Sequence, residues 1–486
     1  MMPIAASFHD LNGLQQMMLR WEEIHPLNAL HVIELGEPVT ETAAQSALDR
    51  AVETLRLGPV EFSHDRTRSR YIPTSSEAGP RVESWRQDPE RTLALPGDPS
   101  RSALLELLED HLNRPFARSG PDWPFRFIHL TTIDGRCYLG VVYRHAVSDS
   151  QGIQKIVRCW LRMLYRLTHP GEPLRTDAPA LKLLYPEELS WKRLPARMRE
   201  IAVELHASRD CYRATPKLPG TTAISGALHG RHLPLAAIRG TARREGVTIQ
   251  DAVFAAMVEG LRLLFDEDME SQKRSTLALY AAADIRREAG VDLDHVLGQF
   301  LGAITVRIKG PAGRPFSEIA ADVTRQSRAV KSSREHLAHA SHLQTMARLW
   351  DLCPMSINRS VGPRLFPVMS LISNVNLTDF FAREIAAGFV VDYHRFTGTG
   401  ILTPMMTGFT TVGSHVNLTT TRHAEIFSAD QQHRLMRHVE RRLTGQLPEI
   451  ATQAHFEAEQ LSRDDTRDLP TVQDLSPNGE LRTRVG

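Results

Sequence analysis

The sequence predicts an α+β protein built from two halves of similar make-up, and three observations support this fold class. The chain has 486 residues, more than one ordinary hydrophobic core accommodates. Apolar stretches typical of strands alternate with longer stretches that have the apolar spacing of helices. A proline-punctuated region separates the two sets of elements. We expect an N-terminal subdomain at 1–190, a crossing linker at 191–227, a C-terminal subdomain at 228–462 and a disordered tail at 463–486.

The overall composition is that of a globular protein with no electrostatic preference for anionic polymers. Lys and Arg number 58 against 57 Asp and Glu, so we expect no nucleic-acid partner. No run of about 18 apolar residues predicts a membrane span, and the N-terminus lacks the pattern of a secretory signal. The four cysteines form no CxxC motif and suit a reducing compartment. We therefore expect a cytoplasmic protein, acting as a monomer.

The elements of the first half follow from local patterns. Residues 101–113 have helical spacing and stop before a proline. The stretch from 63 to 101 is rich in Ser, Pro, Gly and charge, and we interpret it as irregular surface structure with short strands around Tyr71. The earlier elements are a helix at 11–23, a strand at 29–35, and a helix that begins after its cap Thr40.

A hairpin and a long helix form the most informative region. Residues 125–132 predict a strand, Asp134-Gly135 predicts a tight turn, and the return strand at 136–143 is apolar nearly throughout, as a buried central strand is. A short polar loop follows. The helix that begins at about Gln151 carries an apolar stripe on one side and basic residues on the other.

The second half is predicted from similar signals. A helix at 195–209 lies inside the linker, and Thr248 with Asp251 caps an almost wholly apolar helix at 249–265. The remaining expected elements are strands at 276–282, 300–308, 367–373 and 388–393, a hairpin at 407–422, and a final helix capped by Ser428 and Gln431.

His145 and Asp149 lie on the loop between the buried strand and the amphipathic helix, where both ends of the loop are held in place. A neutral imidazole at this position can take a proton from a hydroxyl or an amine as that group attacks an acyl carbonyl. A buried carboxylate at Asp149 needs a cation and can lock the loop. HxxxD alone is a weak pattern, and a histidine at a strand end is more often structural.

These residues also carry a family resemblance. The run from His145 to Ser150 resembles the HHxxxDG motif of nonribosomal peptide synthetase condensation domains, which the bacterial wax ester synthases share. Further resemblances occur in the family's order, over roughly residues 8–450. They are Leu112–Trp123 (an RPF-to-W segment), Val247–Val253 (the start of a buried helix), Leu279–Arg286 (a strand ending in arginine) and Leu371–Val375 (an SNV segment).

The resemblance implies a chloramphenicol-acetyltransferase-like fold, in which two subdomains form a V-shaped cleft with a central tunnel. It implies that His145 is catalytic and that Asp149 is structural, with Arg286 as its ion-pair partner. Ser373 and Asn374 would contact the tunnel or the substrate, although a turn role for Asn374 is the more common one. The resemblance implies no permanent cofactor. The acyl donor would be a thioester on a carrier-protein phosphopantetheine arm or on coenzyme A, and the acceptor a small hydroxyl or amine compound.

Two positions depart from the motif. Arg144 stands where the first histidine is usual, and Ser150 replaces the glycine. Both remain candidates for tunnel or substrate contacts, although neighbours at a strand end point to opposite faces. The departures leave open a catalytically degenerate binding protein, and a lipid-forming enzyme of the wax ester synthase or diacylglycerol acyltransferase type is a further alternative.

No other segment predicts a competing chemistry. Glu335, His336, His339 and His342 form a histidine-rich run, but no HExxH motif or second cluster accompanies it. We interpret this run as a solvated or packed helix and expect no metal. The sequence contains no phosphate-binding glycine motif and no GxSxG serine motif.

Overall fold

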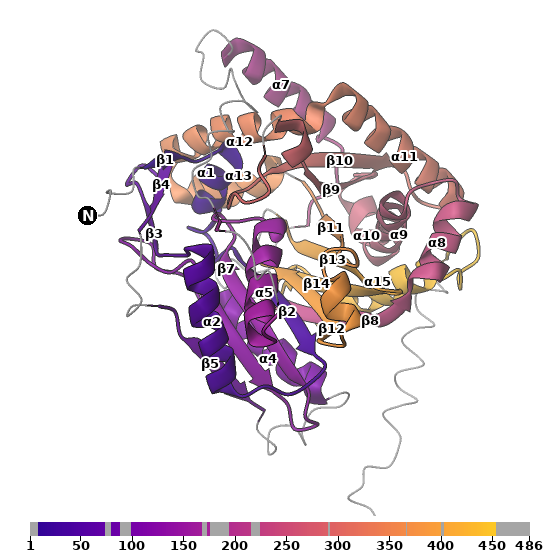
Figure 1. Cartoon of the computed structure of the whole chain (residues 1–486). Helices are drawn as coiled ribbons and strands as arrows, with labels where there is room; N and C mark the ends of the chain where they lie inside the picture. Colours follow the sequence, from indigo (N-terminus) through magenta and orange to yellow (C-terminus); the bar gives the residue numbers. More distant parts are fainter. Residues whose placement is uncertain are drawn as a thin grey trace, which may run out of the picture.

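The computed structural model describes residues 8–72, 79–87, 99–167, 173–174, 194–214, 224–289, 292–365, 367–399 and 403–452. The predicted tail at 463–486 and two parts of the predicted linker, 191–193 and 215–223, lie outside these residues. The described strands form three sheets, and helices cover the outer faces of the two larger ones (Figure 1). None of the described helices combines the length and hydropathy of a membrane-spanning segment.

The first large sheet has five strands in the order β12-β2-β7-β6-β5. Neighbours are antiparallel except β5 and β6, which are parallel. Strands β2 and β7 are buried along their whole length, and for β7 the nearly continuous apolar sequence predicts this. The bounds are β2 Asn28–Leu35, β5 Val82–Arg86, β6 Phe125–Thr131, β7 Cys137–Arg144 and β12 Val390–Thr397.

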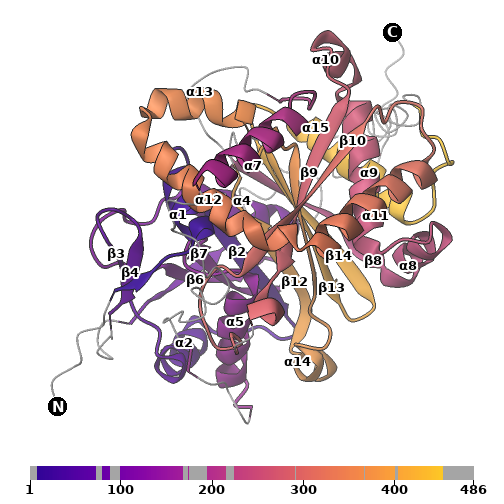
Figure 2. The ribbon, with the colours of Figure 1, turned by 90° about the horizontal axis from the view of Figure 1, so that it is seen from above.

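Helices cover both faces of this sheet. Helices α2 (Glu41–Leu55) and α5 (Ser150–Leu164) lie side by side on one face, and their apolar residues share a core with β2, β6 and β7 (Figures 1 and 2). Helix α4 (Pro99–Asn113) packs on the opposite face. Thr40 caps α2 as predicted. The five-stranded sheet is thus a rigid support for the loop between β7 and α5.

The second large sheet has six strands in the order β10-β9-β11-β13-β14-β8. One face carries helices α8, α9, α11 and α15, which lie together on one side of the fanned strands in Figure 2. The bounds are β8 Ile224–Pro234, β9 Thr276–Asp284, β10 Leu301–Lys309, β11 Ser370–Asn376, β13 Met405–Val412, β14 His415–His423, α8 Leu235–Arg244, α9 Ile249–Leu264, α11 Phe316–Ser333 and α15 Ala429–Leu443.

The two sheets are joined through β12. This strand follows β11 of the six-stranded sheet in the chain, yet it pairs antiparallel with β2 at the edge of the five-stranded sheet. Side chains of β14 donate hydrogen bonds to its backbone carbonyls at 2.5–3.2 Å: Asn417 to Tyr393, Thr419 to Arg395 and Thr421 to Thr397. Alternate side chains of β14 thereby bind the backbone carbonyls of β12 that point away from β2.

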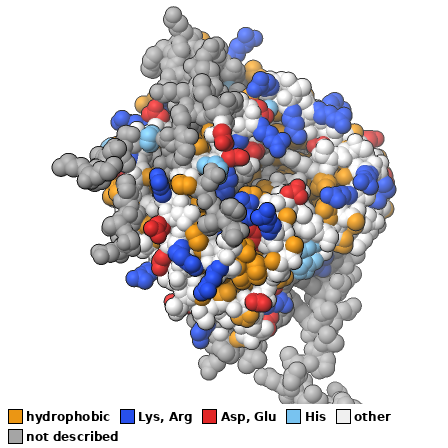
Figure 3. All heavy atoms as spheres, viewed as in Figure 1, with side chains coloured by type: hydrophobic (Ala, Val, Ile, Leu, Met, Phe, Trp, Pro, Cys, Tyr) orange, Lys and Arg blue, Asp and Glu red, His pale blue; other side chains and the backbone are white. Residues whose placement is uncertain are grey.

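The remaining elements flank the junction. Helix α1 (Gly13–Trp21) packs on α12 (Glu335–Leu352) and contributes to an apolar cluster with Ala146. The others are β1 His9–Asp10, β3 Val60–Phe62, β4 Arg68–Tyr71, α7 Leu194–Ala207, α10 Asp266–Ser271, the 3-10 turn Arg286–Ala289, α13 Met355–Leu365 and α14 Ala382–Ala386. On the face seen in Figure 3, described side chains of both charges are interspersed with hydrophobic ones.

One sequence expectation is wrong in part. The stretch from 63 to 101, interpreted as irregular apart from strands near Tyr71, also contains β5, which forms an edge of the five-stranded sheet. Most β5 side chains are partly or fully exposed, so the strand lacks the apolar alternation that would have indicated it. The histidine-rich run begins α12. There His336 is buried with its Nε2 atom 3.6 Å from a carboxylate oxygen of Glu288, whereas the side chain of His339 lies outside the described residues.

Candidate active site

A cavity of about 210 Å³ lies where the two large sheets meet. His145, Asp149, Ser150, Ser373 and Asn374 all line it, together with residues of α1, β9, β10 and β12. A second cavity of about 90 Å³ adjoins it from the side of α1 and the segment that follows β12. His145 lines both cavities. His145 therefore lies where the two cavities adjoin.

The hydrogen bonds of His145 fix which ring nitrogen carries the proton. Its Nδ1 atom lies 3.3 Å from the carbonyl oxygen of Ser148, which can only accept a hydrogen bond. The amide Nε2 of Gln299 lies 3.2 Å from the same Nδ1, but it has only two hydrogens, and the carbonyl oxygens of Ser148 and His145 are both nearer acceptors. Nδ1 is therefore the protonated nitrogen. Nε2 of His145 has no hydrogen-bond partner among the described residues.

Burial lowers the pKa of His145 below its ordinary value of 6.5, because the enclosed site disfavours the charged imidazolium. The hydrogen bond to the Ser148 carbonyl and the charge of Asp149 offset part of this effect. The imidazole is accordingly neutral at pH 7. A neutral ring with its proton on Nδ1 presents Nε2 as a base.

Asp149 holds the loop in place. Its carboxylate caps α5 by accepting from the backbone N–H groups of Gln151 and Gly152, and it also accepts from the N–H of Phe300. Arg286 binds it through both terminal nitrogens, at 2.8 and 2.7 Å. Both side chains are almost fully buried. This is the pairing that the family resemblance implies, and it connects the loop of the five-stranded sheet to the end of β9.

Ser150 belongs to a second polar group on the cavity wall. Its hydroxyl accepts from Gln154 at 3.0 Å and lies 3.3 Å from Nε2 of His31, whose Nδ1 is 2.7 Å from the hydroxyl of Tyr393. Burial lowers the pKa of His31 well below its ordinary value, and the charge of Arg395 lowers it further. The serine at the motif's glycine position is thus integrated into a hydrogen-bonded network.

Arg395 is a buried cation with neutral partners. Its Nε donates to Thr410, one terminal nitrogen to Ser150 and Ser373, and the other to the carbonyls of Ser373 and Phe409, at 2.9–3.4 Å. Burial lowers the pKa of Arg395 to about 10, which still leaves it charged at neutral pH. No carboxylate of the described residues pairs with it. Its charge therefore contributes a positive potential to the cavity.

Two sequence-level interpretations need correction. Arg144 does not line the cavity. Its guanidinium pairs with Glu22 at 2.6 Å and stacks over the ring of Phe62, because consecutive strand residues face opposite sides. Asn374 is not a turn residue. It lies within β11, opposite Phe409 of β13, and lines the cavity.

Comparisons with known proteins identify the architecture. No family model matches the sequence, and no curated protein matches it either. Solved structures do. The first condensation domain of the calcium-dependent antibiotic synthetase, in complex with a substrate analogue, superposes with a TM-score of 0.63 at 12% identity, covering 92% of this chain and 98% of that one. The chain has the condensation-domain fold.

Other structures with this fold are similar to a comparable degree. The starter condensation domain of rhizomide synthetase, in complex with C8-CoA, gives a TM-score of 0.58 at 14% identity over 92% of this chain and 96% of its own. The epimerization domain of the third module of tyrocidine synthetase B gives 0.57 at 11% identity over 95% and 99%. The predicted fold with two chloramphenicol-acetyltransferase-like subdomains is confirmed. Because one of these relatives is an epimerization domain, the fold alone does not select the reaction.

Three residues of this condensation-fold site were missed from the sequence. Gln299 precedes β10 in a segment without any motif, so no signal pointed to it. His31 and Arg395 lie in otherwise buried strands, where a polar or charged side chain needs a partner or a function. That signal was present in both strands.

Proposed function

We propose that this protein is a condensation-type acyltransferase with His145 as the general base. The acyl group would move from a thioester to a hydroxyl or amine acceptor. The observation that carries the proposal is the state of His145: a neutral ring, protonated on Nδ1, with Nε2 unoccupied where two cavities adjoin. Donor and acceptor would enter from opposite sides and meet at this nitrogen.

The proposed reaction needs no acyl-enzyme intermediate. Nε2 of His145 takes the proton of the acceptor hydroxyl or amine as the acceptor oxygen or nitrogen attacks the thioester carbonyl. The tetrahedral intermediate collapses, the carbon–sulfur bond breaks, and the imidazolium returns its proton to the departing thiolate. The products are an ester or amide and a free thiol. The Ser148 carbonyl, bound to Nδ1–H, keeps the ring oriented through both steps.

Arg395 supports this chemistry electrostatically. Negative charge develops on the carbonyl oxygen as the acceptor attacks, and a fixed positive charge in an enclosed site stabilises such charge strongly. Arg395 lines the same cavity as His145, and its guanidinium is held by neutral acceptors that leave its charge uncompensated. Asp149 and Arg286, in contrast, compensate each other and act structurally.

One of the similar structures supports a proposal for the donor class. A similar starter condensation domain has been solved with C8-CoA, which fits a thioester on coenzyme A or on the phosphopantetheine arm of a carrier protein. We propose that the donor is a substrate of this kind, that no cofactor is held permanently, and that the protein acts as a discrete enzyme in specialised metabolism. We retain 1–190 and 228–462 as the proposed subdomains, with β12 exchanged between them.

The test is intact-mass detection of acyl transfer. Wild type, His145→Ala and a control variant, His64→Ala, would be incubated with a panel of acyl-carrier-protein and acyl-CoA donors and with hydroxyl and amine acceptors. His64 is an exposed residue outside the site, so its loss should leave transfer unchanged. Loss of a general base should slow transfer by about 10²–10⁴-fold.

The outcomes separate the alternatives. Transfer that falls in His145→Ala alone supports the proposal and identifies the donor. Transfer only from long-chain acyl-CoA to fatty alcohol or diacylglycerol favours the lipid-forming enzyme. If wild type binds a carrier protein but transfers nothing across the panel, the protein is a binding member of the fold and the catalytic proposal fails.

A further inference from the structure

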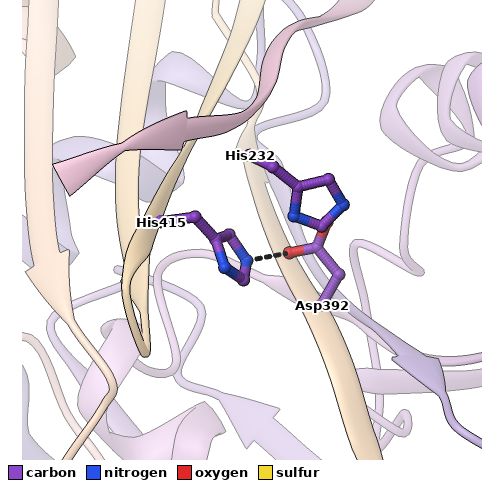
Figure 4. A group of neighbouring side chains, drawn as sticks. All are labelled: His232, Asp392 and His415. Carbon is purple, nitrogen blue, oxygen red and sulfur yellow. Dashed lines mark hydrogen bonds and ion pairs between the residues drawn. The ribbon is translucent and has the colours of Figure 1, made fainter.

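A cluster of three potential metal ligands lies away from the catalytic cavity. His232 on β8, Asp392 on β12 and His415 on β14 each offer one ligand atom, and these atoms all lie within 4.8 Å of one another. Figure 4 shows both imidazole rings beside the Asp392 carboxylate. None of the three lines the cavity around His145. We propose that these residues form a zinc site that fastens β12 to the six-stranded sheet.

The spacing of the ligand atoms fits a metal better than a hydrogen bond. Nε2 of His415 lies 3.4 Å from Oδ1 of Asp392. This is long for a hydrogen bond, whose usual N···O distance is about 2.9 Å. Two ligands bound tetrahedrally to zinc at about 2.0–2.1 Å stand about 3.4 Å apart. The ring centroids of His232 and His415 are 4.5 Å apart, and the three ligand atoms lie within 4.8 Å of one another.

The backbone at His232 is arranged to present its side chain. The pairing of β8 with β14 shifts register between Val416 and Leu418, so β8 carries extra residues opposite Asn417. His232 lies in this bulge with a φ of 61°, a left-handed conformation that costs energy in a residue with a Cβ atom. Bulges re-aim side chains. Here the bulge brings an exposed imidazole beside a buried carboxylate.

Neighbouring polar groups hold the Asp392 carboxylate in place. Asn417 and the backbone N–H of Tyr393 donate to its Oδ1, and Nε2 of His394 lies 3.4 Å from Oδ2. Outer groups of this kind orient metal ligands and tune them.

Asp392 is shared with a second group, formed with Glu34 and His394, but the outer group is the better site. The inner group is fully buried and has one imidazole, so an ion would have no open path to it. The outer group has two imidazoles and reaches solvent through His232. Two imidazoles and one carboxylate, with water as a fourth ligand, are a donor set that suits Zn²⁺. The sequence did not predict it, because the ligands come from three separated segments.

The experiment uses the full-length protein after removal of metals with a chelator. Zn²⁺ would be titrated into wild type and into His232→Asn, with bound metal measured after desalting and Tm measured with and without Zn²⁺. Asparagine tolerates the left-handed conformation, so the variant should fold normally and keep the metal-free Tm of wild type. His64→Asn, the same change at another exposed histidine, is the matched control. His415→Gln tests the second imidazole, and Co²⁺ reports tetrahedral coordination through its visible absorption.

We expect one zinc per chain in wild type and His64→Asn, with a rise in Tm on adding Zn²⁺. His232→Asn and His415→Gln should bind at least about 100-fold more weakly, since even second-layer groups contribute about 10–100-fold, and their Tm should not respond. Equal uptake by wild type and His232→Asn would overturn the proposal, and so would the absence of stoichiometric uptake by wild type. The readouts are independent of acyl transfer, so this proposal and the proposed function can fail separately.

Discussion

Replacing Arg286 with methionine should strongly destabilise the protein. The change leaves the Asp149 carboxylate, which is 1% exposed, with three backbone N–H donors but without the cation that it binds at 2.8 and 2.7 Å. Removing one partner of a buried ion pair costs about 3–5 kcal/mol. We expect a loss of this size in the free energy of unfolding, measured by denaturant titration with the fluorescence of the six tryptophans, among which Trp160 is buried in α5.

The double variant Asp149→Asn with Arg286→Met sharpens this prediction. Asparagine keeps an oxygen for the N–H groups that begin α5, but its amide nitrogen faces the N–H of Phe300, so one buried donor loses its acceptor. That loss costs about 1–3 kcal/mol. The double variant should therefore be more stable than Arg286→Met alone. Arg287→Met, at an exposed neighbouring arginine, is the control. A loss below about 1 kcal/mol in Arg286→Met, or a double variant no more stable than it, would refute the reasoning.

Three further predictions concern the cavity. Because burial lowers the pKa of His145, kcat/KM for acyl transfer should be constant above pH 7 and should fall only when the pH drops below 6.5 and the base becomes protonated. If kcat/KM already falls as the pH is lowered towards 7, this prediction is wrong. Arg395→Met should lower kcat by about 10²–10³-fold, and Arg395→Lys, which keeps the charge, should retain more activity; equal losses would argue against an electrostatic role. Gly302→Ala should lower the free energy of unfolding by about 1–3 kcal/mol, because the added Cβ would lie 2.3 Å from the backbone carbonyl of His336; an unchanged denaturation midpoint would show that the strand can shift.

Elements with strong local signals could be predicted from the sequence. Ser428 with Gln431 forms a capping box at α15, and Thr248 caps α9, because such caps depend on residues three apart. The hairpin before the His145 loop is likewise local. Strand β5 escaped prediction because an exposed edge strand has no apolar alternation. The sheet to which β12 belongs was not predictable either, since partners in a sheet are chosen by packing between distant segments.

Site residues could be predicted from the sequence where the neighbouring segment has a clear pattern of its own. His145 and Asp149 follow a buried strand and precede an amphipathic helix, and Arg286 follows an apolar strand. Gln299, which lies 154 residues away and places its amide 3.2 Å from Nδ1 of His145, could not be found in this way, because no local pattern links the two residues. Arg395 needed the knowledge that its strand crosses to the other sheet. Chemistry that arises where distant segments meet is not encoded in any one of them.

The hydrogen bonds from side chains of β14 to backbone carbonyls of β12 determine whether the two halves of this protein can be separated. Strand β12 is an edge of the five-stranded sheet, and its outward carbonyls are occupied by the amide and hydroxyl groups of Asn417, Thr419 and Thr421. A fragment ending before β8 would lack β12 and leave β2 as an open edge, and open edges promote aggregation. A fragment beginning at β8 would carry β12 without the strand it pairs with. We therefore expect the two halves to fold as one unit, and neither half to be stable as a separate fragment.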